Sequence, residues 1–296
     1  KASDAMNAGD KTAENPLLAP WTAPHGLPPF DAIRAEHFAP AFEAAMREHR
    51  AELDAIALQS EAPSFANTVS RLDASGRAFA RIDGVFHNLC ASETNDALQA
   101  AQRELAQPMA AHSNAMYLNA QLFARLDDLH AHRAALGLDA QGQRLLEQLH
   151  SDFVRAGARL AGAERERFAE RNERLAALMT SFGQNVLADE ASYRLSLKTE
   201  ADMAGLPDFV RDAARQAAAD RGLEGAVITL SRSLIVPFLT FSERRDLREA
   251  AWRAWTSRGE HDGPTDNRPV IREILELRAE QAAALGYSNY ADYALA

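Results

Sequence analysis

Apolar residues recur at steps of three, four and seven along most of the chain, which is the spacing of an amphipathic helix. The first such stripe predicts a helix over 39–58, with Pro40 accommodated in its first turn. A second stripe begins after Ser64, a good N-cap residue, and continues to Leu89. The pattern therefore predicts two long helices in the first third of the chain.

The middle of the chain continues the helical pattern, with proline and glycine marking its breaks. A helical stretch over 95–135 contains Pro108, whose ring and missing N–H group are expected to kink or split it. Another helix is expected from Asp139 through Leu160, and after Gly162 the pattern resumes over 163–187. The central part of the chain is thus predicted to be almost wholly helical.

The period changes to two only in the last third of the chain. Apolar and polar residues alternate there, so we expect a few short β-strands around 193–197 and 226–241, the latter in the parts 226–230 and 235–241. Helices are expected again in four segments: 207–221, 242–255, 269–285 and from Ser288 onward. The expected fold class is therefore mainly α, a multi-helix region with a few short strands.

The segment before the first helix is different in character. Residues 1–14 show no periodicity and are expected to form a mobile tail. The density of proline over 16–30 excludes helix. We expect this segment to lie extended across a core, held there by Trp21, Leu27 and Phe30.

The rest of the chain, 15–296, is interpreted as one helical region. Its last predicted helix opens at Ser288 and meets no glycine, proline or basic stop signal before Ala296. We therefore expect the region to be truncated, with a further domain following it in the complete protein.

Composition and charge narrow the classes of partner. Of the 296 residues, 47% are apolar and 25% are charged, as in ordinary globular proteins. The 32 Lys and Arg against 42 Asp and Glu give a net charge of −10, without the basic footprint of a nucleic-acid-binding protein. The longest strongly apolar stretch, 234–241, is far shorter than the roughly 18 to 20 residues that span a bilayer. We expect neither nucleic acid nor a membrane as a partner.

The single cysteine, Cys90, lies among apolar residues and is expected to be a small buried hydrophobic side chain. Nothing beside it resembles an activating base, so it is not assigned as a nucleophile. One thiol is compatible with a reducing or an oxidising compartment, and the sequence leaves a cytoplasmic or a periplasmic location open.

Nine histidines raise the question of a metal site. His130 and His132 are two residues apart on a predicted helix and point to different faces. Glu147 and His150 share a face, as do Asp127 and His130, which is similar to half of a carboxylate-bridged di-metal bundle. The second Glu-x-x-His element of such a site is missing. We expect ordinary surface or core-edge positions for these residues, with a di-metal helical oxidase as an alternative.

Two features lie on the helix predicted after Ser242. Arg244, Arg245 and Arg248 form a basic ridge, interpreted as solvated or ion-paired, with carboxylate recognition as the alternative. Trp252 and Trp255, at i and i+3, are interpreted as part of a core stripe, with the lining of a groove as the alternative.

Short strings spread over nearly the whole chain after the tail resemble a known family in their order and spacing. They are NPLL at 15–18, PPFD at 28–31, HFAPAF at 37–42, PSFANT at 63–68, DFVRAGA at 152–158, FGQNVL at 182–187, LPD at 206–208, PFL at 237–239, RRDLRE at 244–249, and GY at 286–287 with YA at 290–291. Together they resemble the thimet-oligopeptidase family of zinc metallopeptidases, most closely its bacterial peptidyl-dipeptidase (dipeptidyl carboxypeptidase) branch.

The resemblance implies a mostly helical, two-lobed enzyme whose deep channel admits short peptides and excludes folded proteins. The family's zinc site combines an H-E-x-x-H helix with a third Glu ligand. In that site zinc polarises the scissile carbonyl and activates water, and the motif Glu transfers protons. This chain contains no H-E-x-x-H motif, so the resemblance places the site beyond Ala296. No catalytic, cofactor-binding or metal-binding residue is carried over to this chain.

The sequence and the resemblance together lead to one functional hypothesis. The chain is interpreted as the N-terminal, non-catalytic region of a zinc peptidase that releases C-terminal dipeptides. It would form one wall of the substrate channel, pack against the missing catalytic half, and be inactive alone. The alternative is a complete helical peptide-binding or interaction module without catalysis.

Overall fold

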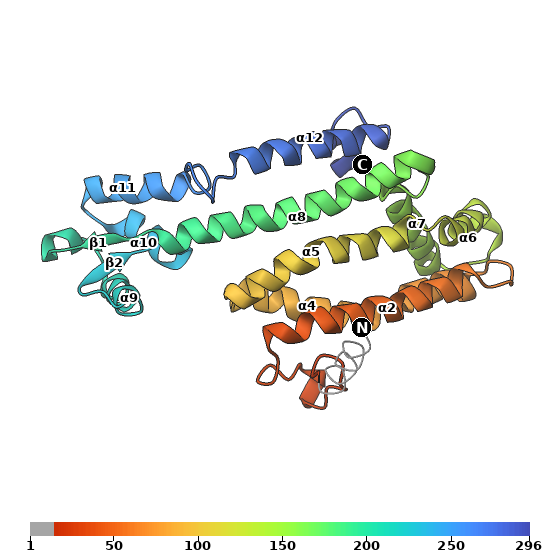
Figure 1. The fold of residues 1–296 in the computed structure, drawn as a ribbon, viewed down its shortest axis with the longest axis horizontal. Coiled ribbons are helices and arrows are strands. Elements are labelled where there is room, and N and C mark those ends of the chain that lie inside the picture. Colours follow the sequence, from red (N-terminus) through yellow and green to blue (C-terminus); the bar gives the residue numbers. More distant parts are fainter. Residues whose placement is uncertain (1–14) are drawn as a thin grey trace, which may run out of the picture. The chain divides into compact units, whose positions relative to one another are not determined.

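The computed structural model describes residues 15–296, so the tail predicted over 1–14 lies outside the described residues (Figure 1). The described chain is mainly helical, with two short strands, which confirms the predicted fold class. It divides into two compact units. The first holds the described residues up to Ala177 together with Leu277–Ala296, and the second holds Leu178–Glu276.

The first unit is built from helices. They are α2 (Phe38–Ala57), α3 (Ser70–Ala74), α4 (Arg77–Ser92), α5 (Asp96–Tyr117), α6 (Ala120–Ala131), α7 (Ala140–Arg155) and α13 (Tyr290–Leu295), with 3-10 turns at Pro24–Gly26, Ala35–His37 and Arg133–Ala135 and a π-helical turn at Phe65–Val69. The helices α8 (Gly162–Ser192) and α12 (Arg268–Ala284) contribute residues to both units. Within residues 15–296, none of the helices is both long and apolar enough to cross a membrane.

One end of α2 packs against α4 and α5 around a cluster of aromatic rings. The Phe38 and Phe42 rings of α2 lie 4.8 and 5.4 Å from the ring of Phe86 on α4. The N-terminal segment is held against this core by Leu17 and Ile33, both buried, and not by the largely exposed Leu27 and Phe30 that were predicted to hold it. Trp21 does pack against the core, as predicted.

The other end of α2 packs with α3, α6 and α7 around a second apolar core, which contains Leu53, Leu126 and Phe153. Arg125 on α6 is buried beside it. Its guanidinium donates hydrogen bonds to four neutral acceptors: the backbone oxygens of Gln59 and Glu61, Asn67 Oδ1 and Thr68 Oγ1. The buried cation thereby fastens the loop after α2 to α6.

The second predicted helix is broken at Gly76, which its periodicity did not predict. The Ser64 hydroxyl caps the start of the segment as expected, by accepting the N–H of Asn67 at 3.1 Å. Gly76 has a left-handed φ of 69°, and its N–H donates to the Glu52 carboxylate on α2 at 2.7 Å. A Cβ atom on Gly76 would lie 2.7 Å from the ring of His49, also on α2. Contacts with α2 therefore accompany the break between α3 and α4.

The stretch predicted over 95–135 is not split at Pro108, because α5 continues through it. Leu105 and His112, on either side of the proline, are both buried and hold the helix in place. The break comes instead at Asn119, whose side chain accepts the N–H of Leu122 and caps α6.

The next two helices lie where they were predicted, with different ends. α7 begins after Asp139, whose carboxylate caps it, but it ends at Arg155 and not at Leu160. The chain turns there, and Gly157 takes a left-handed φ of 93°. α8 begins at Gly162 and continues past its predicted end to Ser192.

The second unit surrounds its own apolar core with two strands and three complete helices. They are β1 (Leu195–Leu197), α9 (Asp208–Ala219), β2 (Ala226–Ile228), α10 (Arg232–Phe241) and α11 (Arg245–Thr256), with a 3-10 turn at Glu200–Met203. The strands pair antiparallel, with Leu195 opposite Ile228 and Leu197 opposite Ala226. The strand predictions around 193–197 and 226–230 are therefore confirmed.

The strand predicted over 235–241 is wrong, because this segment belongs to helix α10. Its buried residues are Leu234, Ile235 and Phe238, at the i, i+1 and i+4 spacing of a helix face. Pro237 also has no N–H to donate to a sheet ladder. A short apolar run has no period that distinguishes a buried helix from a buried strand, and here the helical spacing of burial decides.

The last helices follow the predictions, with shifted starts. α11 begins at Arg245, because Ser242 turns the chain and its hydroxyl accepts the N–H of Arg244 before the helix starts. α12 occupies the segment predicted over 269–285. α13 is capped by the side chain of Asn289 and not by Ser288.

The loop that follows α11 is tied to α8 by buried polar side chains. The Asp189 carboxylate of α8 accepts the Gly259 N–H at 2.7 Å and the Thr265 hydroxyl at 2.6 Å. Asn267 is 2% exposed and donates to the backbone oxygen of Phe182. The chain therefore leaves α11 and enters α12 along a path that hydrogen bonds to α8 define.

Replacing Gly76 by alanine is expected to destabilise the chain more than the same change at Gly222. Both glycines have a left-handed φ, but a Cβ on Gly222 meets no atom within 4 Å. Gly222→Ala should cost about 1 kcal/mol for the backbone conformation alone. Gly76→Ala should cost about 2 to 4 kcal/mol, because it also displaces the His49 ring. Urea unfolding measures both values, and equal losses would contradict the close contact with His49.

Candidate functional site

A hollow of about 500 Å³ opens on the second unit beside α11. It is lined by Leu239 of α10 and by Arg245, Arg248, Glu249 and Trp252 of α11. We call it the α11 hollow. The four residues of α11 lie at i, i+3, i+4 and i+7, so they share one face of that helix.

The opposite face of α11 holds the helix on the core of the unit. Ala251 is fully buried there, and Leu247, Ala254 and Trp255 are partly buried against the same core. These positions recur at i, i+4, i+7 and i+8, the pattern of an amphipathic helix. The sequence of α11 therefore turns Arg245, Arg248 and Trp252 away from the core.

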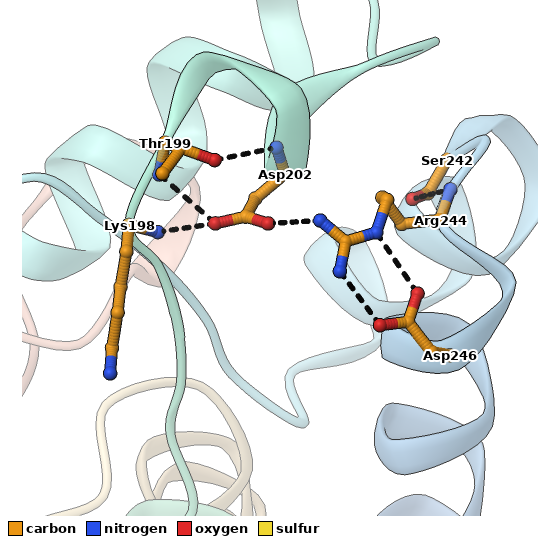
Figure 2. A network of polar contacts seen from close by, with 6 residues as sticks. All are labelled: Lys198, Thr199, Asp202, Ser242, Arg244 and Asp246. Carbon is orange, nitrogen blue, oxygen red and sulfur yellow. Dashed lines mark hydrogen bonds and ion pairs between the residues drawn. The ribbon is translucent and has the colours of Figure 1, made fainter.

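Arg244, the first residue of the predicted basic ridge, is ion-paired. Its guanidinium contacts the carboxylate of Asp202 and donates two hydrogen bonds, of 3.0 and 2.7 Å, to Asp246 (Figure 2). The other oxygen of Asp202 accepts the backbone N–H groups of Lys198 and Thr199. The ion-paired interpretation is confirmed for Arg244, which joins the turn after β1 to the start of α11.

Both carboxylates of this network are held in their charged form. Desolvation is the largest influence on Asp202 and raises its pKa, but the N–H groups of Thr199 and Lys198 and the charge of Arg244 outweigh it, so the pKa is lowered. Hydrogen bonds from Arg244 lower the pKa of Asp246. The network therefore stays ionised at neutral pH, and Arg244 is not free to bind another anion.

The other two arginines of the ridge have no carboxylate partner among residues 15–296. Arg248 donates one hydrogen bond, of 3.0 Å, to the backbone oxygen of Ser242. Glu249, which also lines the hollow, accepts two hydrogen bonds from Arg253. In the part of the chain that the structure describes, no Asp or Glu forms an ion pair with Arg245 or Arg248. The hollow therefore carries two guanidinium groups whose charge is not neutralised.

The two tryptophans of α11 have different roles. Trp255 is half-buried against the core of the unit and lies beneath the guanidinium of Arg258, 5.6 Å from its ring centre. The core interpretation is correct for this residue. Trp252 is 52% exposed and lines the hollow, so for it the alternative of a groove lining is correct.

The histidines and acids considered as metal ligands come together only in part. Asp127 accepts a hydrogen bond from His150 Nε2 at 2.8 Å, and the rings of His150 and His130 stack face to face at 3.8 Å. Glu147 instead faces Arg133. Because the stacked rings lie in parallel planes, their nitrogen lone pairs do not converge on one ion. Among residues 15–296, no group of three or more His, Cys, Asp or Glu residues could hold a metal ion.

A second histidine pair, which the sequence did not reveal, is buried between α2 and α5. His49 Nδ1 lies 2.9 Å from His112 Nε2, and His49 Nε2 lies 3.2 Å from the hydroxyl of Ser75. That hydroxyl donates to the backbone oxygen of Leu72, so it accepts from His49. When both rings are neutral, His49 Nδ1 therefore accepts from His112 Nε2.

Burial disfavours charge on this pair. Burial, followed by the neighbouring His49 and Arg50, lowers the pKa of His112 to about 4. Burial also lowers the pKa of His49, against the nearby Glu52 carboxylate, which raises it. Nδ1 of His112 is buried and has no hydrogen-bond partner among the described residues. The pair is thus a neutral element of the core.

Comparison with known proteins finds relatives over nearly the whole chain. Residues 238–296 match the model of peptidase family M3. The chain is 37% identical over 286 residues to the dipeptidyl carboxypeptidase of Escherichia coli (strain K12). The aligned region covers 96% of this chain and 42% of that protein. It is 29% identical over 286 residues to oligopeptidase A of Salmonella typhimurium, and this alignment covers 95% of this chain and 42% of that protein. The chain spans about two fifths of the length of these relatives.

These matches confirm the predicted resemblance to the peptidases of this family. The identity is higher to the protein named dipeptidyl carboxypeptidase than to the one named oligopeptidase A. The segment that matches the family model also contains every residue that lines the α11 hollow. The hollow therefore lies in a part of the chain that is similar to peptidases.

The neutral histidine pair is expected to make stability depend on pH. Since the pKa of His112 is lowered from 6.5 to about 4, the unfolded chain binds this proton more readily than the folded chain does. The contribution to stability is complete above pH 6.5 and is lost as the pH falls from 6.5 to about 4. We expect a decrease of about 3 kcal/mol in the free energy of unfolding across this window.

Urea unfolding at successive pH values measures this decrease, and two variants identify its source. His112→Gln keeps an N–H donor for His49 but cannot be protonated. The stability of this variant should therefore decline less than that of the unmodified chain as the pH falls. His132→Gln changes an exposed histidine at the end of α6, and this variant should behave like the unmodified chain. A decline in His112→Gln as steep as in the unmodified chain would show that the buried pair is not responsible.

Proposed function

We propose that this chain, a relative of the M3 peptidases, is the N-terminal, non-catalytic portion of a zinc metallopeptidase that hydrolyses short peptides. The observation that carries the proposal is the similarity of 95 to 96% of the chain to peptidases of which it spans only 42%. The higher identity to a dipeptidyl carboxypeptidase favours the release of dipeptides from the C-terminus of the substrate.

Zinc belongs, in this proposal, to a part of the longer protein that the chain does not contain. The described residues do not fit such an ion, since none of their His, Cys, Asp and Glu side chains gather in a group able to hold one. The sequence has no H-E-x-x-H motif either. We therefore assign no metal ligand and no catalytic residue to this chain, and we expect it to be inactive alone.

We also propose that the second unit provides one wall of the substrate channel. This unit makes up a third of the chain, yet it carries nine of the thirteen large apolar side chains that are exposed among the described residues. Phe209, Phe241 and Trp252 are among them. Phe209 and Phe241 lie together, with 6.3 Å between their ring centres, and contiguous exposed apolar side chains are typical of surfaces that contact a ligand or another part of a protein.

The alternative, a helical module that binds peptides without catalysis, rests on the α11 hollow. Its lining residues all belong to α10 and α11, so the hollow needs no further domain to form. Both proposals place peptide on this unit, and they differ in whether hydrolysis follows.

The native gene product decides between them. Its mass in source cells, measured with an antibody against this chain, should be well above the 32.3 kDa of the chain. The purified product should release dipeptides from the C-terminus of short peptides, lose this activity to a chelator and regain it with zinc, because the metal supplies the activated water. The 296-residue chain should release none.

Two results would contradict the proposal. A native product of 32.3 kDa would leave peptide binding without catalysis as the function. Zinc-dependent hydrolysis by the 296-residue chain alone would contradict its assignment as the non-catalytic portion.

A further inference from the structure

We propose that the α11 hollow binds the free C-terminal carboxylate of a short peptide together with the apolar side chain next to it. Arg245 and Arg248 would hold the carboxylate, and Trp252 and Leu239 would contact the side chain. That the ligand is a peptide rests on the proposed function. That it is an anion with an apolar neighbour rests on the hollow itself.

Three other arginines in or beside α11 are paired with carboxylates. Arg244 is matched by Asp202 and Asp246, Arg253 by Glu249, and Arg258 by Glu190. This matching is expected in a chain with ten more acidic than basic residues. Arg245 and Arg248 both border the hollow, and among the described residues neither has a carboxylate partner, which is also true of Arg221 and Arg232 elsewhere in the unit. Two adjacent guanidinium groups without a carboxylate partner attract an anion.

Arg245 lies in the first turn of α11. The N-terminal end of a helix carries a partial positive charge, so acidic residues stabilise it and a cation there is unfavourable. Arg245 therefore does not serve the stability of α11. An anion beside it would offset this cost and would also interact with Arg248, one turn further along the same face.

The side chains around the hollow favour a carboxylate as the anion. The guanidinium group presents parallel N–H donors that match the two oxygens of a carboxylate. Trp252 is 52% exposed beside these donors, and Leu239 adds a second apolar contact. A carboxylate with an apolar side chain on the adjacent carbon, as at the end of a peptide, matches both parts of the hollow. Its volume of about 500 Å³ lies within the range of sites that bind small ligands.

Calorimetric titration of the 296-residue chain tests the site with four probes. The first is a tetrapeptide that ends in phenylalanine with a free carboxylate, and the second is the same peptide with a C-terminal amide. The third is the amide with an internal glutamate, and the fourth is inorganic phosphate. The free acid should bind, and the other three should bind at least about tenfold more weakly, because only the first presents a carboxylate beside an apolar side chain.

Variants locate the binding on the hollow. Arg245→Gln and Arg248→Gln should each weaken the free acid about tenfold, because each removes one charged donor. Trp252→Ala should reduce the preference for phenylalanine over alanine at the end of the peptide. Arg221→Gln is the matched control, since it removes an arginine of the same unit that is exposed, as Arg245 is, but lies outside the hollow, and it should leave binding unchanged.

Each contrary result overturns a stated part of the inference. Equal binding of the amide excludes the carboxylate terminus as the ligand. Equal binding of the internal glutamate or of phosphate shows a general anion site. Unchanged binding in both Arg245→Gln and Arg248→Gln, with native circular dichroism, places the peptide elsewhere.

The inference and the proposed function fail in different ways. A native product that hydrolyses peptides while neither arginine variant affects binding would remove only the inference. Binding of the free acid by a native product of 32.3 kDa without hydrolysis would remove only the proposed function.

Discussion

The second unit depends on a buried carboxylate that is satisfied by a loop far away in the sequence. Asp189 lies on α8, and its two oxygens accept the Gly259 N–H and the Thr265 hydroxyl. A buried charge without such partners would be strongly destabilising, so the loop and the helix need each other. Arg125 follows the same rule in the first unit, where a buried guanidinium is surrounded by oxygens of the loop after α2. Apolar clusters supply the bulk of each core, and these polar side chains define how the chain turns between helices.

This constraint also positions the α11 hollow. The start of α11 is fixed by Arg244 between Asp202 and Asp246, and the loop after its end is fixed by Asp189. Between these points the apolar face of the helix packs on the core, so the opposite face is held outward, with only local hydrogen bonds from Arg248 to Ser242 and from Arg253 to Glu249. Because α11 is fixed at both ends and packed on one face, its stability does not depend on the charged and aromatic side chains of the other face. Those side chains can therefore contact a ligand. The proposal of a peptide-binding wall relies on that separation.

The sequence predicted well those features that depend on neighbouring residues. Helical stripes and the caps at Ser64 and Asp139 are local, and they are present as expected. The break at Gly76 was missed because it is accompanied by contacts with His49 and Glu52 of another helix. The segment 235–241 was assigned to a strand because a short apolar run has no distinctive period. The basic ridge was recognised as a candidate, but its division into paired Arg244 and unpaired Arg245 and Arg248 depends on Asp202, a residue of another turn. Asp246, two residues after Arg244, is a local partner, but the local sequence does not reveal the second carboxylate, Asp202.

The dependence of the second unit on Asp189 is tested most directly by native-state hydrogen exchange at the amide of Gly259. If the carboxylate holds the loop, this amide should exchange as slowly as the core amides of α8, and Asp189→Ala should remove the protection while the apolar core of the unit stays protected. Exchange of the Gly259 amide at the rate of an exposed loop in the unmodified chain would contradict this account. The path of the chain from α11 to α12 would then have to be fixed by something other than the buried carboxylate.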